Sequence, residues 1–351
     1  MRTGNNLIPS ILSVAYPFAP VSLDATGGAE QILALLDRGI TAAGHHSVVL
    51  AAEGSCVSGT LISCPIPPGP IDEPMRQCVH SIWRNAIAET LRRHPIDLIH
   101  FHGVDFHRYL PAAGTPVLAT LHLPPSFYPE SVFSLERPRT WLNCVSASQR
   151  NCCPLSPLVA GVVENGVPHE LFDTPATPAS GYVVSLGRIC PEKGFHLALD
   201  AADRAGVPLH LAGKLYPYPD HVRYWRTELQ PRLRPPHRFL GPIGMQRKPA
   251  LLAAARCLLA PSLVAETSSL VAMEALACGT PVVAFAAGAL PEIVAHRQTG
   301  FVVRDSLEMA EAIRQADGLD RQSCRFEARR RFSCETMVAR YLDLYARLLR
   351  L

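Results

Sequence analysis

Short apolar segments alternate with helical patterns along the whole 351-residue chain, and this alternation restricts what the chain can fold into. It is typical of parallel sheets built from βαβ units. In the first half the expected strands are 11–16, 48–52, 98–101, 117–121 and 142–145, with a helix over 29–43. In the second half they are 182–186, 209–212, 238–240, 257–260, 282–285 and 301–303. No repeat of 20–50 residues is present, which argues against a solenoid.

A segment rich in proline and small residues, 174–180, separates the two runs of strands and is the best linker candidate. We therefore expect one Rossmann-like domain over 1–170 and a second over 171–333, a division that suits the chain length. Residues 334–351 carry apolar side chains on one helical face, and we expect this helix to pack back on the first domain. Because parallel sheets bind ligands beyond the carboxyl ends of their strands, we predict two doubly wound α/β domains facing each other across a cleft.

Composition excludes several classes of protein. Hydrophobic residues make up 48% of the chain and charged residues 18%, which argues against disorder. The net charge is +3 without any block of Lys or Arg, so a nucleic-acid partner is not expected. Eleven scattered cysteines with no C-x-x-C pair suggest reduced core residues of a cytoplasmic protein. No apolar run reaches about 18 residues, so no transmembrane segment is expected, while peripheral membrane contact stays open.

Two cations follow a predicted strand in the segment 187–194. Gly187 allows a tight turn, and Arg188 and Lys193 lie at the carboxyl end of that strand, before a helix. A diphosphate bound there would gain both charges and the free N–H groups of the helix. The alternative is a solvated basic loop.

A second candidate segment, 266–274, lies between the strand 257–260 and a helix expected from about residue 268 to 277. Glu266 precedes the helix and Glu274 lies two turns along it, and carboxylates accept hydrogen bonds from vicinal hydroxyls. The N–H groups of Ser268, Ser269 and Leu270 at the helix start suit a phosphate. The alternative is that Glu266 only balances the helix dipole and that Glu274 lies on the surface.

Glu266 and Glu274 match the E-x7-E signature of retaining glycosyltransferases of the GT-B fold, family 4, and the chain resembles that family over nearly its whole length. Further stretches occur in the family's order, and these are Gly27-Gly28-Ala29-Glu30, Asn165-Gly166-Val167, Gly187-Arg188 with Lys193-Gly194, and the run 277–283. The resemblance implies transfer of a hexose-type sugar from a nucleotide diphosphate sugar, with UDP-sugar as the default donor, to an unidentified acceptor.

The resemblance also implies roles for individual residues. Arg188 and Lys193 would neutralise the diphosphate of the donor, and Gly27 and Gly28 would let the first domain's backbone approach the same phosphates. A nucleotide sugar is then a substrate, and no cofactor is expected. The chain has no D-x-D motif, so no metal is expected either, and these cations would support the leaving group.

Other positions are expected around the sugar and the nucleoside. The resemblance implies that Glu266 binds the 3- and 4-hydroxyls of the sugar and Glu274 the ribose, with Ile243 near the base. His122, after the strand 117–121, matches a histidine near the transferred sugar, although a structural histidine is the alternative. His100 and His102 share one strand face, and without a third ligand we interpret them as cleft or packing residues.

The chain departs from the family at Thr267-Ser268-Ser269, where Pro-Phe-Gly is common, and this bears on the identity of the donor. A glutamate on the sugar hydroxyls is poorly placed to attack C1, so we expect front-face attack. The acceptor, a glycan, lipid-linked sugar or small molecule, would contact loops 23–26, 104–108 and 124–127. Alternatives are a non-hydrolysing nucleotide-sugar epimerase and a non-catalytic nucleotide-sugar-binding protein. A dinucleotide oxidoreductase would need a G-x-G-x-x-G motif that Gly27-Gly28-Ala29 does not supply.

Overall fold

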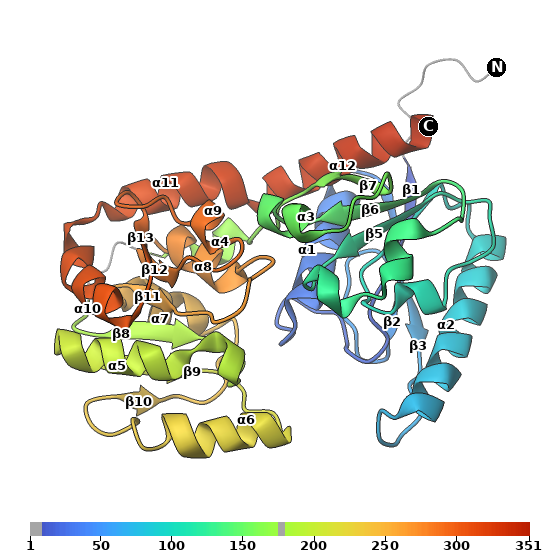
Figure 1. Ribbon diagram of the computed structural model, residues 1–351. Coiled ribbons are helices and arrows are strands. Elements are labelled where there is room, and N and C mark those ends of the chain that lie inside the picture. The colour runs from blue at the N-terminus through green and yellow to red at the C-terminus, as the bar shows by residue number, and fades with distance from the viewer. Residues whose placement is uncertain (1–8, 175–179) are drawn as a thin grey trace. The chain divides into compact units, whose positions relative to one another are not determined.

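The computed structural model describes residues 9–174 and 180–351, and the chain divides into two compact units (Figure 1). The first unit runs to Asn165 and includes Cys334–Leu351, and the second runs from Gly166 to Ser333. The boundary therefore falls before Gly166 rather than after residue 170. The predicted linker, 174–180, lies outside the described residues except at its two ends. The expectation that the units face each other across a cleft stays a prediction.

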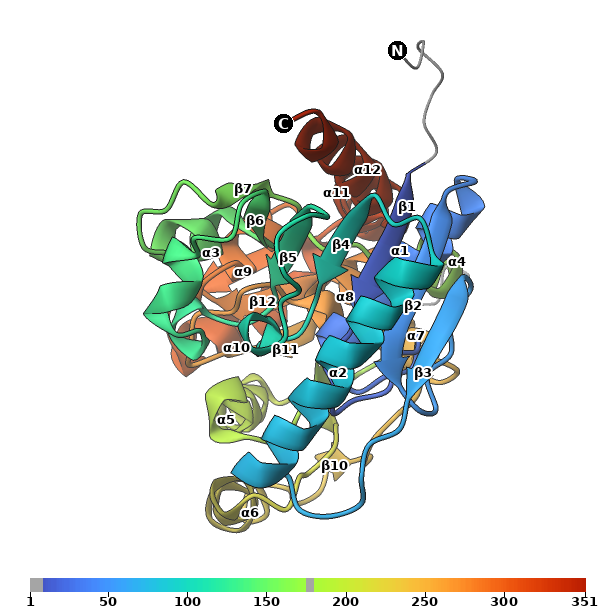
Figure 2. The same ribbon diagram turned by 90° about the vertical axis from the view of Figure 1, so that its right-hand side faces the viewer.

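The first unit is built on a parallel sheet of seven strands in the order β3-β2-β1-β4-β5-β6-β7 (Figure 2). The strands are β1 Ser10–Val14, β2 His46–Ala52, β3 Thr60–Cys64, β4 Leu98–Phe101, β5 Val117–Leu121, β6 Thr140–Cys144 and β7 Val159–Val162. The order steps outward from β1 on both sides, so the direction of winding reverses between β1 and β4. This reversal is the feature that opens a ligand crevice in doubly wound folds.

Helices and short 3-10 turns connect these strands. They are α1 Gly28–Ala42, α2 Glu73–Arg93, η1 Phe106–Arg108, η2 Pro125–Phe127, η3 Glu130–Ser134 and α3 Ala147–Cys152. α2 begins at Glu73 because the Asp72 side chain accepts a hydrogen bond from the Met75 N–H. Its buried residues, Val79, Trp83, Ile87 and Thr90, form one narrow apolar stripe on a mostly polar helix.

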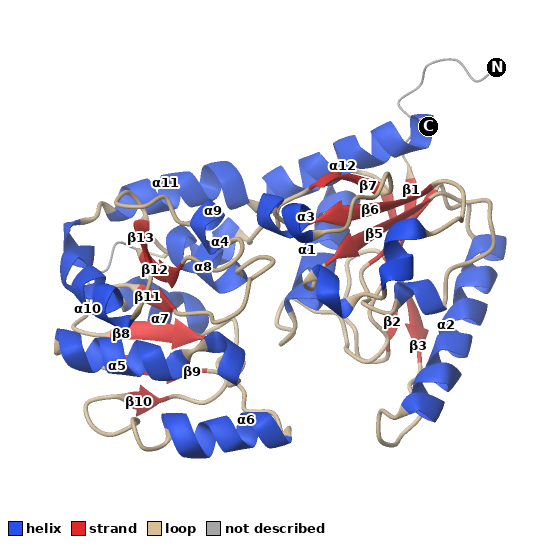
Figure 3. Cartoon of the chain, in the orientation of Figure 1, coloured by secondary structure: helices blue, strands red, loops and turns tan. Residues whose placement is uncertain are grey.

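The C-terminal helix α12, Cys334–Arg350, belongs to the first unit and packs on α1 (Figure 3). The contact is close at Gly39, where an added Cβ would lie 2.3 Å from Cγ2 of Val338. α12 also reaches buried polar groups of the sheet. Tyr345 OH lies 2.7 Å from Nδ1 of His100, and Tyr341 OH lies 3.1 Å from Oγ1 of Thr120. These hydrogen bonds satisfy polar groups that would be costly to bury unpaired.

The second unit holds a parallel sheet of six strands in the order β10-β9-β8-β11-β12-β13. The strands are β8 Val183–Leu186, β9 Leu209–Ala212, β10 Arg238–Phe239, β11 Leu258–Ala260, β12 Val282–Phe285 and β13 Gly300–Val303. The helical elements are α4 His169–Phe172, η4 Pro191–Lys193, α5 Phe195–Ala205, α6 Pro219–Tyr224, η5 Trp225–Leu229, α7 Lys248–Ala254, α8 Leu270–Ala277, α9 Leu290–Ile293, α10 Ser306–Gln315, η6 Ala316–Gly318 and α11 Arg321–Phe332. Two buried apolar clusters cover the two faces of this sheet. The predicted fold class, two Rossmann-like α/β units, is confirmed.

All eleven cysteines lie in the described part of the chain, and all are free thiols, most of them buried. This agrees with their predicted use as small core residues. Within residues 9–174 and 180–351, no helix combines the length and the apolar composition that a bilayer crossing requires.

Candidate active site

The turn after β8 carries both predicted phosphate-binding cations. It runs from Gly187 through η4 to Gly194, where α5 begins. Gly194 has φ 63°, and an added Cβ would lie 2.1 Å from the carbonyl oxygen of Pro261. Glycine is therefore required there, both for the left-handed backbone and for close packing on the loop after β11. That packing brings Lys193 to the segment that holds Glu266.

Lys193 and Glu266 form an ion pair, with Nζ of the lysine 2.6 Å from Oε1 of the glutamate. Their side chains are 27% and 14% exposed, so the pair is reachable from solvent but largely desolvated. Ser262 donates a second hydrogen bond to the same Oε1, at 2.8 Å. Lys193, Ser262, Glu266 and Ser269 line a pocket at the carboxyl ends of β8 and β11. The sequence analysis placed Lys193 and Glu266 after two separate strands, and Ser262 was not predicted as a partner of either residue.

The backbone of Glu266 is held from its other side by the loop before α9. Ala289 donates its N–H to the Glu266 carbonyl at 2.8 Å, and Glu266 forms an isolated parallel bridge with Gly288. Gly288 has φ 60°, and a Cβ there would lie 2.2 Å from the Glu266 carbonyl oxygen. A side chain at position 288 would thus displace Glu266.

Helix α8 begins later than predicted. Ser269 has extended backbone, with φ −134° and ψ 93°, so the first helical residue is Leu270 and Ser268 lies in the preceding loop. Of the three N–H groups predicted to lie at the helix start, only that of Leu270 belongs to the first turn of α8. The Oγ of Ser268 is buried in that loop and has no hydrogen-bond partner among the described residues. Arg188 follows β8 and is exposed, and its contact with a diphosphate stays a prediction.

Glu274 is buried in α8, with 2% exposure, and its Oε1 lies 2.7 Å from Nζ of Lys248. Burial raises the pKa of the Glu274 carboxyl, while Lys248 acts in the opposite direction. The idea that Glu274 lies on the surface is wrong. Lys248 was not predicted as a partner of Glu274. It is the first residue of α7, where its charge opposes the helix dipole, and this unfavourable position is a signal of a nearby anion.

The other residues that were predicted to bind the nucleotide sugar lie in both units. Gly27 is the N-cap of α1 and Gly28 its first residue, directly beyond the β1 loop of the first unit. Their contact with a ligand held by the second unit stays a prediction. Ile243, after β10, is a partly buried residue packed against a core cluster of the second unit, and its role near the base also stays a prediction.

His122 follows β5, and its Nε2 lies 3.0 Å from Nδ1 of His102, which follows β4. Burial lowers the pKa of His122 to about 4, so the imidazole is neutral near pH 7. His100 is a buried packing residue whose two ring nitrogens bond to Tyr345 and Thr120. The sequence placed His100 and His102 on one face but did not identify His102 as the partner of His122.

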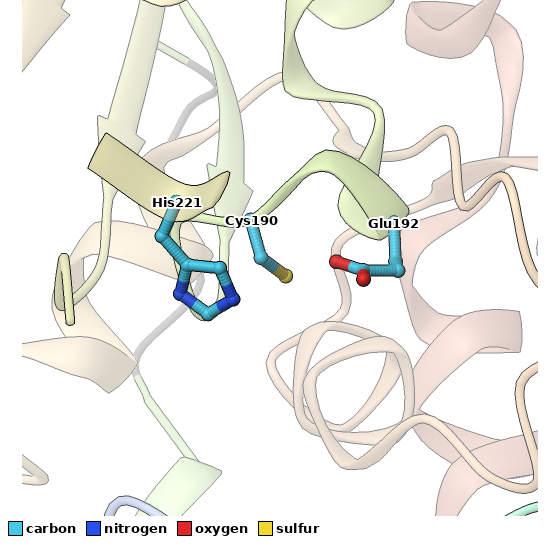
Figure 4. Close-up of side chains that lie close together, drawn as sticks. All are labelled: Cys190, Glu192 and His221. Carbon is cyan, nitrogen blue, oxygen red and sulfur yellow. The ribbon is translucent and has the colours of Figure 1, made fainter. Parts of the chain in front are cut away.

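Three side chains of metal-binding type lie together, two of them in the 187–194 turn and the third on α6 (Figure 4). They are Cys190, Glu192 and His221, and one ligand atom of each lies within 4.8 Å of the others. Burial raises the pKa of the Cys190 thiol to about 11, and Glu192 adds to this rise. A metal bound at Cys190 would have to displace the thiol proton, and burial opposes the charged thiolate that this would leave. Because the Cys190 thiol also donates to the Arg188 carbonyl, we assign the cluster to support of the turn.

Both halves of the chain match models of glycosyltransferase families. The model described as Glycosyltransferase Family 4 matches residues 26–171, and that described as Glycosyl transferases group 1 matches residues 180–316. A curated relative, the D-inositol 3-phosphate glycosyltransferase of Mycobacteroides abscessus, is 48% identical over 65 residues. That alignment takes in 18% of this chain and 14% of the relative.

Solved structures share the fold over almost the full chain. AviGT4, a glycosyltransferase involved in avilamycin A biosynthesis, has a TM-score of 0.73 and 25% identity, covering 97% of this chain and 98% of its own. Anabaena HepE, in complex with UDP and glucose, has a TM-score of 0.74 and 20% identity, covering 96% of this chain and 99% of its own. The two family matches and the shared fold together place this chain among the GT-B glycosyltransferases of family 4.

Proposed function

We propose that the chain transfers a hexose from a nucleotide diphosphate sugar, with a UDP-sugar as donor, to a hydroxyl group of an acceptor. The transfer proceeds with retention of anomeric configuration and without a metal ion. The observation that carries this proposal is the Lys193–Glu266 pair at the carboxyl ends of β8 and β11. It places a cation suited to phosphate next to a carboxylate suited to sugar hydroxyls.

The main electrostatic demand of the reaction is the negative charge that grows on the departing nucleotide diphosphate. Lys193 and the exposed Arg188 lie on one turn, and together they would supply two positive charges to the diphosphate. Each charge-assisted hydrogen bond contributes about 1.5–3 kcal/mol. The turn can therefore stabilise the leaving group through its own side chains, which is why we propose that no metal is needed.

Glu266 is suited to hold the sugar. Both side-chain hydrogen bonds recorded for it in the described residues fall on Oε1, so Oε2 is the oxygen that can accept from a sugar hydroxyl. A carboxylate engaged with Lys193 and Ser262 is fixed in position, which favours orientation of the sugar over attack on its C1. We therefore propose front-face attack, in which a donor phosphate oxygen takes the acceptor's proton. Trapping of a covalent sugar on the Glu266→Gln protein would rule this mechanism out.

Two similarities support the choice of substrates. HepE is recorded with UDP and glucose, which supports a UDP-hexose donor. The curated relatives are named for an inositol 3-phosphate acceptor, but they match this chain over less than a quarter of its length. We propose a hydroxyl-bearing acceptor and include inositol phosphate among those to be tried.

The test is a panel of UDP-, GDP- and ADP-hexoses added to the purified chain. A nucleotide diphosphate sugar that binds should raise the melting temperature, because ligand at 100 times Kd stabilises a protein by about 2.7 kcal/mol. We expect nucleotide release that depends on acceptor and persists in EDTA. Conversion of the donor sugar without acceptor would instead identify an epimerase. Binding without turnover over a broad acceptor panel would favour a non-catalytic nucleotide-sugar-binding protein.

A further inference from the structure

A second buried histidine lies beside His122, and the proposed reaction gives it no role. His102 directly follows β4, is 3% exposed, and places its Nδ1 3.0 Å from Nε2 of His122. The strands β4 and β5 are neighbours and run parallel, so both histidines lie at the same edge of the first unit's sheet. The two ring planes are 21° apart in orientation, and their centroids are separated by 5.3 Å.

The ring of His102 also packs against the ring of His100, and the two centroids lie 4.0 Å apart. His100 cannot serve as its hydrogen-bond partner, because Nδ1 of His100 bonds to Tyr345 and Nε2 to Thr120. Nε2 of His102 is buried and has no hydrogen-bond partner among the described residues. Within the described parts of the chain, the bond to His122 is therefore the one side-chain hydrogen bond of His102.

This arrangement decides which imidazole donates. Burial lowers the pKa of both rings, so each carries a single N–H, and one must donate to the other. If His122 donated, the proton of His102 would lie on Nε2, as a buried N–H without an acceptor. If His102 donates, its Nε2 is only a bare acceptor. Orphaned buried N–H groups are rarer than unsatisfied acceptors, so the second arrangement is favoured.

We propose that His102 is a positioning residue, which donates from Nδ1 to Nε2 of His122 and so keeps the His122 proton on Nδ1. His122 then presents Nδ1–H, a hydrogen-bond donor, rather than a lone pair at that nitrogen. Its use toward a hydroxyl oxygen of the transferred sugar rests on the proposed function. The position of the proton does not.

The test is the tautomer of His122 in the full chain, labelled with ¹⁵N-histidine and observed through long-range ¹H–¹⁵N correlations of the imidazole rings. The His122 signals are assigned by their loss in His122→Gln. We expect Nδ1 to be protonated and Nε2 to be bare in the wild-type protein. Protonation on Nε2 would overturn the proposal, whether or not the protein transfers sugar.

Two substitutions test whether His102 causes this state. His102→Leu removes the donor, and we expect the His122 proton to move to Nε2 or to exchange between both nitrogens. His102→Asn keeps an N–H on the atom bonded to Cγ, as Nδ1 is, and should keep the wild-type pattern. His46→Gln, on the exposed first residue of β2, is the control, and it should leave the His122 signals and the turnover unchanged.

Turnover should follow the tautomer. We expect kcat to fall by about 3- to 10-fold in His102→Leu, the worth of one hydrogen bond, and by less than about 3-fold in His102→Asn. A His122 that keeps its proton on Nδ1 in the leucine variant would show that His102 does not set it. An inactive wild-type protein with the expected tautomer would contradict the proposed function and leave the proton assignment intact.

Discussion

Replacement of Lys193 by methionine is the most informative perturbation of the candidate site. Methionine keeps the length of the apolar stem and removes the charge that lies 2.6 Å from Glu266. A charge-assisted hydrogen bond contributes about 1.5–3 kcal/mol, so the loss should lower kcat/KM for the donor by about 10- to 150-fold. The affinity for UDP should fall with it, since UDP carries the diphosphate that Lys193 is proposed to bind.

Glu266→Gln separates the two roles of the pair. UDP has no sugar, so we expect its Kd to change by less than about 3-fold or to become tighter, because Lys193 is released from Glu266. Transfer of sugar should still fall by about 10-fold or more. Titration calorimetry gives the Kd for UDP, and initial rates of nucleotide release give the rate of transfer.

Arg204→Met, which removes an exposed charge at the far end of α5, is the matched control for Lys193→Met. A Lys193→Met protein with unchanged UDP affinity would refute the reasoning.

Three further predictions concern the supports of the site and its electrostatics. Gly288→Ala should lower transfer by at least about 10-fold, because its Cβ would meet the backbone of Glu266, and a crystal structure of the variant with Glu266 unmoved would contradict this. Tyr345→Phe should lower the free energy of unfolding by about 1–2 kcal/mol in urea, because Nδ1 of His100 loses its partner, and an unchanged midpoint and slope would count against that bond. The pKa of His122 lies near 4 in the folded chain, against an ordinary 6.5, so the native state binds fewer protons between these values. The free energy of unfolding should therefore fall as pH falls from about 6.5 to 4, by up to about 1.4 kcal/mol per pH unit for this group, and His122→Gln should flatten that slope.

Much of the fold could be predicted because buried parallel strands are continuous apolar runs. The strands 98–101, 117–121, 209–212 and 282–285 have the same bounds in the structure. The edge strand β3 was missed, since most of its side chains are at least partly exposed. The long helix α2 was missed for a similar reason, because its apolar stripe is narrow. Apolar pattern is a weak signal where an element buries little surface.

The candidate site could also be predicted only in part. The family resemblance assigned Lys193 and Glu266 to one donor, and the structure brings them together beyond the neighbouring strands β8 and β11. Ser262, Lys248 and His102 could not be assigned as partners, because each pairing depends on side-chain geometry between elements. Sequence pattern locates strand ends, whereas tertiary packing decides which side chains on them form a hydrogen bond.

A crystal structure of the chain with bound UDP tests the central claim most directly. We predict that the diphosphate lies within hydrogen-bond distance of Arg188 and Lys193, with Glu266 on the same side and directed to the place where the sugar would extend. A diphosphate bound away from the 187–194 turn, or one that leaves Lys193 paired with Glu266 and out of reach, would contradict the account.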